Sequence, residues 1–65
     1  MAYAFRIVEH RDGSFSYLRG REDLLLFSQL DDALDHATVM ASEQPPSSVL
    51  LHHLEGHVEV IATFD

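Results

Sequence analysis

Cysteine, lysine and tryptophan are all absent from this chain of 65 residues. Without cysteine the protein forms no disulfide and no zinc site built on thiolates. A domain this short buries only about 60% of the surface that its unfolded chain exposes. Its core then contributes roughly 3–5 kcal/mol of stability. Because these cross-links are excluded, the composition favours stabilisation by association with another chain.

Basic residues are few and are confined to the first third of the chain. All four are arginines: Arg6, Arg11, Arg19 and Arg21. The four acids of residues 1–23 balance them, so the net charge of −7 arises entirely from residue 24 onward. A negative field of this kind repels phosphate backbones and anionic membrane surfaces. Neither a membrane nor a nucleic acid is therefore an expected partner.

Long apolar runs are also lacking. The uninterrupted runs Leu24–Phe27 and Val49–Leu51 are far shorter than a membrane-spanning helix requires. The first residues show no basic leader followed by a long apolar run, so a secretory signal peptide is not expected. Together with the absence of cysteine, this pattern predicts a cytoplasmic protein.

The first part of the chain predicts a β-hairpin. Residues 3–10 alternate aromatic or β-branched side chains with smaller or charged ones, which is the period of a strand. Asp12-Gly13 is a strong signal for a hairpin turn, and residues 15–18 resume the alternation. The sequence leaves the register open, because a two-residue turn and a longer loop through Arg11 are both compatible with it.

A helix is predicted over residues 29–42. Ser28 is suited to accept an unpaired backbone N–H of the first turn as the N-cap, and Pro45-Pro46 ends the helix. Residues 24–27 before it form either a third short strand or an apolar segment leading into the helix. One face of the helix carries apolar residues at helical spacing: Leu30, Ala33, Leu34, Ala37, Met40 and Ala41.

A second hairpin is predicted from Val49 to Phe64, with Glu55-Gly56 as a two-residue turn. This turn places two sets of side chains on opposite faces. The set predicted to face the core is Val49, Leu51, His53, Val58, Val60, Ala62 and Phe64. The other set is Leu50, His52, Leu54, His57, Glu59, Ile61 and Thr63. The expected fold is therefore a single α+β domain, residues 1–65, with one helix on one face of a four- or five-stranded sheet.

The caps and turns carry a resemblance to a known family. The residues that match are Asp12-Gly13, Phe27-Ser28, Asp31-Asp32-Ala33-Leu34, Ala37, Leu51-His52 and Gly56. Their order resembles that of the small bacterial domains of unknown function numbered 2188. The chain differs from the family's usual composition in having no lysine and no tryptophan. The resemblance implies a bacterial protein with the same order of elements, and it implies no activity, cofactor or site residue.

Histidines and acids suggest one candidate metal site. In the predicted second hairpin, His52, His57 and Glu59 share a face, where cross-strand neighbours lie close enough to reach one ion. His52 and His53 point to opposite faces and do not chelate together. The spacing matches no recognisable zinc motif, which favours a half-exposed polar face carrying a His–Glu pair. No cofactor is expected, and His10 and His36 are expected at the surface.

The sequence offers no candidate catalytic residue. Asp31, Asp32 and Asp35 lie at the predicted helix start, where negative charge interacts favourably with the helix dipole. The serines fall at caps, turns and strand faces, and none lies in a nucleophile elbow. The three glycines are isolated from one another, so no phosphate-cradling loop is present. We therefore expect a protein that is not an enzyme.

Arginines in the first hairpin suggest a second alternative. Arg6 and Arg19, flanked by Tyr3, Phe15 and Tyr17, resemble the basic and aromatic surface of some single-strand binders. The corresponding function is a nucleic-acid-associated accessory protein, which either reads strands through this hairpin or presents its acids as a phosphate mimic to a DNA-binding partner. Charge complementarity within or between subunits, with an arginine-bearing hairpin near an acidic helix, explains the same residues more simply.

The favoured function is self-association as a homodimer or binding of another protein. One helix covers one face of a sheet, whereas the second hairpin is predicted to be apolar on both faces. Monomers seldom expose a contiguous apolar patch of this kind. The predicted interface residues are Leu50, His52, Leu54, Glu59 and Ile61. The alternative is that residues 24–27 of the same chain cover this patch.

Overall fold

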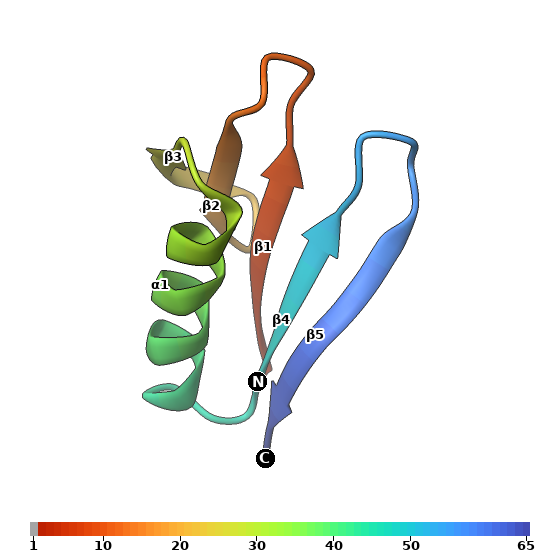
Figure 1. The fold of residues 1–65 in the computed structure, drawn as a ribbon. Helices are drawn as coiled ribbons and strands as arrows, with labels where there is room; N and C mark the ends of the chain where they lie inside the picture. The colour runs from red at the N-terminus through yellow and green to blue at the C-terminus, as the bar shows by residue number, and fades with distance from the viewer. Residues whose placement is uncertain (1) are drawn as a thin grey trace.

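A mixed sheet with one helix against it makes up the fold of residues 2–65, the part of the chain that the computed structural model describes (Figure 1). Met1 of the predicted domain lies outside the described residues. The elements in order are β1 (Tyr3–Glu9), β2 (Phe15–Arg19), β3 (Glu22–Phe27), α1 (Leu30–Ser42), β4 (Ser47–His52) and β5 (Val58–Phe64). The predicted α+β class and order of elements are confirmed, and residues 24–27 belong to a third strand.

The two hairpins lie side by side in a single sheet. The strand order is β3-β2-β1-β4-β5, with β1 and β4 parallel at the centre and every other pair antiparallel. Because β1 and β4 run in the same direction, both hairpin loops emerge at the same end of the sheet (Figure 1). Segments more than forty residues apart in the sequence therefore meet at this end.

Both hairpins close through three-residue loops. The N–H of His10 donates to the carbonyl of Ser14 at 2.9 Å, and the N–H of His53 donates to that of His57 at 2.8 Å. Gly13 and Gly56 end the two loops at φ values of 89° and 97°, a region in which a Cβ atom is strained. The longer-loop alternative for the first hairpin is correct. The two-residue turn predicted for the second hairpin is wrong.

A β-bulge at Ile61 separates two parts of β5. Ala62 and Phe64 pack against the core as predicted, whereas Val58 and Val60 do not. Ala62 lies opposite Val49, but Val60 lies opposite Leu50, so Ile61 is the extra residue in the ladder. The three-residue loop shifts Val58 and Val60 by one position from the predicted register, so the prediction that they face the core is wrong. Beyond the bulge, Ala62 is back on the predicted core side.

Helix α1 packs through a stripe of alanines. Ala33, Ala37 and Ala41 are fully buried, and their small side chains let the helix lie close to the sheet. This confirms the predicted buried face. The predicted N-cap Ser28 is wrong, because Gln29 occupies the N-cap position in extended conformation and makes no side-chain capping bond. At the other end, the hydroxyl of Ser47 donates to the carbonyl of Ala41 at 2.6 Å and joins β4 to the helix.

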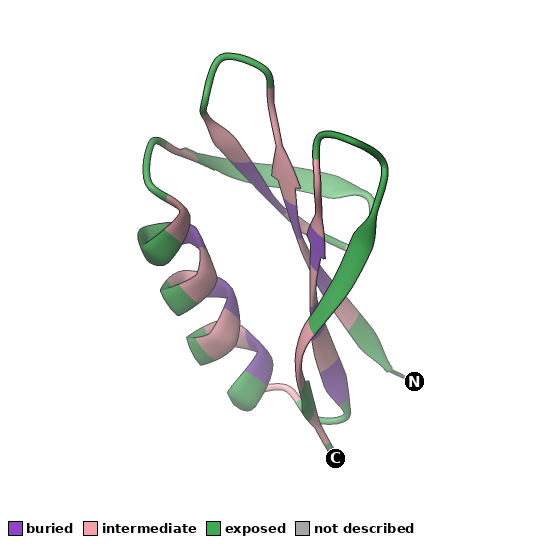
Figure 2. Ribbon diagram, turned by 45° about the vertical axis from the view of Figure 1, so that its right-hand side comes forward, coloured by how far each residue is buried: buried purple, intermediate pink, exposed green. Residues whose placement is uncertain are grey.

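The core lies between the helix and the centre of the sheet. Its largest fully buried side chains are Phe5, Ile7, Tyr17 and Val49. His36 of α1 also faces inward and meets the ring of Tyr17 edge-on at 4.6 Å, so the predicted surface position of His36 is wrong. Figure 2 shows burial concentrated on the inner side of the helix and the central strands, whereas β3 and the first half of β5 are exposed.

Candidate protein interaction surface

The sheet face opposite the helix is the candidate surface, and we call it the open face. Residues directly opposite one another in a ladder point to the same side of the sheet. The buried core residues fix the helix side, so the alternate positions define the open face. Its main side chains are Arg6, Val8, Ser16, Leu18, Asp23, Leu26, Leu50, His52, Val58 and Val60.

Apolar side chains extend across the open face from one edge to the other. At the rims, Leu26 is 68% exposed, Val60 61% and Val58 46%. Toward the centre, Leu18 and Leu50 are half-buried by their neighbours. Helix α1 packs on the opposite side, and no element of residues 2–65 covers this face. Exposed apolar side chains gathered on one face of a sheet are typical of a surface that binds another molecule.

Four polar side chains, those of Arg6, Ser16, Asp23 and His52, lie on the open face among the apolar ones. Arg6 on β1 and His52 on β4 sit on adjacent strands, with Arg6 opposite Leu50 and His52 opposite Val8. The Nε of Arg6 and the Nε2 of His52 are buried and have no hydrogen-bond partner among the described residues. An unpaired buried polar atom reduces stability. The face therefore combines apolar area with polar atoms whose hydrogen-bonding capacity is unused.

The structure separates the five predicted interface residues. Leu50 and His52 lie on the open face. Leu54 lies in the loop of the second hairpin and is 53% exposed. Glu59 and Ile61 lie on the helix side, with Ile61 packed against the core, so the prediction that all five share one face is wrong. The three-residue loop causes the difference, because it places Glu59 opposite Leu51 rather than opposite His52.

Sequence reasoning missed the valines of β5. Val58 and Val60 were assigned to the core from a regular ladder and a two-residue turn, whereas the structure places both on the open face. A loop pattern that occurs twice in the sequence could have indicated the correct register of β5. His10 and His53 are each followed by two residues and a glycine, so a three-residue loop in one hairpin implied the same loop in the other.

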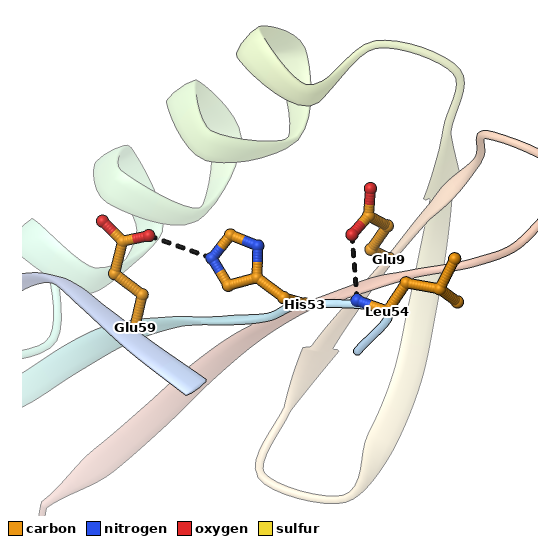
Figure 3. A network of polar contacts seen from close by, with 4 residues as sticks. All are labelled: Glu9, His53, Leu54 and Glu59. Carbon is orange, nitrogen blue, oxygen red and sulfur yellow. Dashed lines mark hydrogen bonds and ion pairs between the residues drawn. The ribbon is translucent and has the colours of Figure 1, made fainter. Parts of the chain in front are cut away.

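A polar cluster joins the two hairpins at the loop end of the sheet (Figure 3). The Nε2 of His53 lies 3.0 Å from the Oε1 of Glu59, and the ring of His53 stacks on that of His57 at 5.2 Å. The backbone N–H of Leu54 donates to the Oε1 of Glu9 at 2.9 Å. These contacts hold the second loop against the end of β1.

The predicted metal-ligand set is not brought together. Glu59 lies opposite Leu51 on the helix side and contacts His53, whereas His52 lies on the open face, so the prediction that His52, His57 and Glu59 share a face is wrong. Within residues 2–65, no group of three or more histidine or acidic side chains is arranged to hold a metal ion.

A hollow beside this cluster is lined by Glu9, His53, Leu54 and Glu55. It opens widely to solvent, and only Leu54 among its lining residues has an apolar side chain. Sites for small organic ligands are usually enclosed and mainly apolar. The hollow therefore lacks the walls that would hold such a ligand away from water.

The arginines of the first hairpin do not form one surface. Arg6 lies opposite Leu18 on the open face, whereas Arg19 lies opposite Phe5 on the helix side. Tyr17, predicted to flank them, is buried under the helix. The prediction that Arg6 and Arg19 share an aromatic face is therefore wrong, and the stacking platform of a single-strand binder is not formed by these residues.

Two side chains have shifted pKa values. Hydrogen bonds from the hydroxyl and then the backbone N–H of Ser14 lower the pKa of Asp12, and they fix the first hairpin loop. Burial raises the pKa of Tyr17 above its ordinary value, and nearby Arg19 only partly opposes this effect. The hydroxyl of Tyr17 has no hydrogen-bond partner among the described residues. Both shifts arise from local structure rather than from a cluster of reactive groups.

The fold and the surface together define a class: a small α+β protein with one helix on a mixed sheet and an uncovered apolar face on the other side. Comparison with models of protein families, with curated proteins and with solved structures gave no match. Within residues 2–65, no helix has the length and apolar character needed to cross a membrane.

Proposed function

We propose that this protein is a non-enzymatic protein interaction module that self-associates through its open face. The observation that carries the proposal is the exposure of Leu26 on β3 and of Val58 and Val60 on β5, on a face that no element of the described chain covers. Burying such a surface against a second copy releases water from both copies, and this is the main favourable term in protein association.

A small domain has a particular reason to associate. The fully buried part of the helix stripe consists of three alanines, which contribute little apolar area. A chain of 65 residues has a correspondingly small margin of stability. A partner that binds only the folded state adds to that margin by mass action. A second copy is the partner always present with the protein, and closed two-fold dimers are the commonest assemblies.

The area of the open face sets the expected strength of association. Five strands at the usual spacing span about 24 Å, and six residues of strand extend about 20 Å. The face thus offers about 500 Å² per copy, or about 1,000 Å² in a dimer, which is the lower limit for a specific interface. We expect micromolar rather than nanomolar dissociation constants.

Arg6 does not prevent this burial. The aliphatic part of an arginine can lie along an apolar surface while its charged end reaches the rim. The side chain is already half-buried on the open face, beside Leu18 and Leu50. Its charge lowers the affinity that the apolar area alone would give, which agrees with the weak association expected from the area.

The proposal is tested by analytical ultracentrifugation over a range of micromolar concentrations. Val60→Asp places a charge on the open face, where Val60 is 61% exposed, and the variant is expected to remain monomeric when the wild type associates. Val39→Asp is the matched control, because Val39 is 49% exposed on α1, away from the open face. Circular dichroism verifies that both variants are folded. A wild type that stays monomeric at high micromolar concentration would refute the proposal.

A further inference from the structure

The outer edge of β3 is the second unpaired surface of the sheet. β3 is the terminal strand and pairs only with β2 in the described chain. Leu24, Leu25 and Leu26 are 41%, 46% and 68% exposed. Glu22, Asp23 and an irregularity at Leu24 lie in the first half of β3, but Leu25–Phe27 contains no proline, charged residue or bulge, the features with which proteins commonly protect free edges. An exposed leucine-rich edge is therefore available to pair with another strand.

The opposite edge of the sheet is less suited to pairing. β5 carries the bulge at Ile61 in the second half of the strand, and a bulge bends and twists the strand in which it occurs. The irregularity in β3 falls at Leu24, close to the start of the strand, and leaves Leu25–Phe27 in regular register with β2. Of the two edges, β3 thus offers a regular stretch in which all three residues are apolar.

We infer that β3 pairs antiparallel with β3 of a second copy about a two-fold axis. This pairing joins two five-stranded sheets into one continuous sheet, with the leucines of one strand beside those of the other. The inference rests on the proposed self-association and adds a second contact to it. A strand added to a free edge gains main-chain hydrogen bonds along its length.

The positions of the charged residues favour antiparallel over parallel pairing of the two β3 strands. Arg21 lies immediately before β3, in the turn from β2, whereas Asp31 and Asp32 lie in the first turn of α1, shortly after the strand ends. Antiparallel pairing brings Arg21 of each copy toward Asp31 and Asp32 of the other, so attraction occurs twice. Parallel pairing sets Glu22 against Glu22, and like charges directly opposite are destabilising.

The area of the open face gives an independent reason for this pairing. One copy offers about 500 Å², which is marginal for a specific interface. Two copies joined through β3 offer about 1,000 Å², and two such joined sheets packed face to face bury about 2,000 Å², within the range of stable interfaces. The assembly expected is a tetramer with its two sheets inside and its helices outside.

Sedimentation of two variants separates the edge contact from the face contact. Leu25→Lys changes a residue on the helix side of β3, opposite Tyr17, and so leaves the open face intact. The wild type is expected to sediment as a tetramer at high micromolar concentration, Leu25→Lys and Val60→Asp each as a dimer, and the double variant as a monomer. Val39→Lys is the control for an added lysine and is expected to match the wild type.

Each other outcome has a defined meaning. A wild-type dimer that Val60→Asp dissociates and Leu25→Lys does not would overturn the edge inference and leave the proposed function standing. A wild-type dimer with the opposite response would support edge pairing and remove the role of the open face. A monomeric wild type would remove both.

A charge exchange provides a second test that does not depend on the leucines. Arg21→Glu is expected to weaken the tetramer to a dimer, because the introduced carboxylate would then face the acids of the other copy's helix. Adding Asp31→Lys and Asp32→Lys in the same chain is expected to restore the tetramer. Failure of the triple variant to recover, with its helix content unchanged, would count against the antiparallel arrangement.

Discussion

Glu9, the last residue of β1, accepts a hydrogen bond of 2.9 Å at its Oε1 from the backbone N–H of Leu54, which follows it by 45 residues. The ladder between β1 and β4 ends one residue earlier, at the pair Val8 and His52. This side-chain contact therefore links the two hairpins beyond the last backbone pair. It also fixes the second loop relative to β1.

Removal of the Glu9 carboxylate should loosen the second loop selectively. Glu9→Ala is expected to cost about 1 kcal/mol at the loop, which corresponds to roughly fivefold faster exchange of the Leu54 amide hydrogen. Glu9→Gln retains a side-chain oxygen acceptor and should keep most of the protection. Hydrogen exchange followed by NMR measures both. Equal exchange rates in the wild type and Glu9→Ala would mean that the contact does not hold the loop.

Tyr17 should make the protein less stable at alkaline pH. Burial raises the pKa of Tyr17 above 10.0, so the unfolded chain loses its phenolic proton at a lower pH than the folded chain does. This contribution is fully present below pH 10.0 and is lost as the pH rises toward the pKa of the folded state.

Tyr17→Phe removes this titration and also removes a buried hydroxyl without a hydrogen-bond partner in the described chain. The variant is expected to be as stable as the wild type at neutral pH, or about 1 kcal/mol more stable, and to decline less above pH 10. Urea denaturation across this pH range measures the difference. Tyr3→Phe, at a residue 44% exposed, is the control and should follow the wild type. Parallel curves for the wild type and Tyr17→Phe would contradict the prediction.

The same substitution at two neighbouring residues of β5 should change the free energy of unfolding by very different amounts. Ile61→Asp puts a charge against the core and is expected to lower the free energy of unfolding by at least ~2 kcal/mol. Val60→Asp lies on the open face and should change that energy by no more than ~0.5 kcal/mol in the monomer. Urea denaturation at a concentration low enough to keep both proteins monomeric measures the two values. The reverse order would show that Val60, and not Ile61, faces the core.

Arg6 should weaken association through the cost of removing its charge from water. Arg6→Met keeps a long apolar side chain on the open face and eliminates the Nε that has no partner among residues 2–65. Replacement of buried ionic groups by apolar ones of similar size is often neutral or stabilising. Arg6→Met is therefore expected to associate several-fold more tightly than the wild type in sedimentation equilibrium. Weaker association of the variant would mean that the guanidinium makes a favourable contact across the interface.

Local signals in the sequence were sufficient for most of the secondary structure. The alternation in residues 3–10, the glycine turns and the alanine stripe from Ala33 to Ala41 each depend on residues close in the chain, and the structure agrees with them. The N-cap at Ser28 was wrong even though it was also a local prediction, because β3 runs on to Phe27 and the chain remains extended through Gln29.

The candidate surface was only half predictable. Leu50 and His52 were placed correctly, since β4 is regular and its alternation fixes their side of the sheet. Val58, Val60 and Ile61 were placed on the wrong sides, because the second hairpin closes through three residues rather than two, which shifts this part of β5 by one position. His36 was expected at the surface, yet it packs against Tyr17, a contact made only once helix and sheet meet.

The sequence by itself determined the two hairpins and the helix but left residues 24–27 open, and it determined that this protein has no disulfide, no lysine and a strong negative charge. These properties follow from composition and from interactions between residues a few positions apart. The tertiary structure alone decided that β1 and β4 pair in parallel, that Glu9 meets Leu54, and that the valines of β5 lie on the open face. The physical reason is that strand register depends on backbone pairing between distant segments, and a single extra residue changes which side of the sheet is apolar.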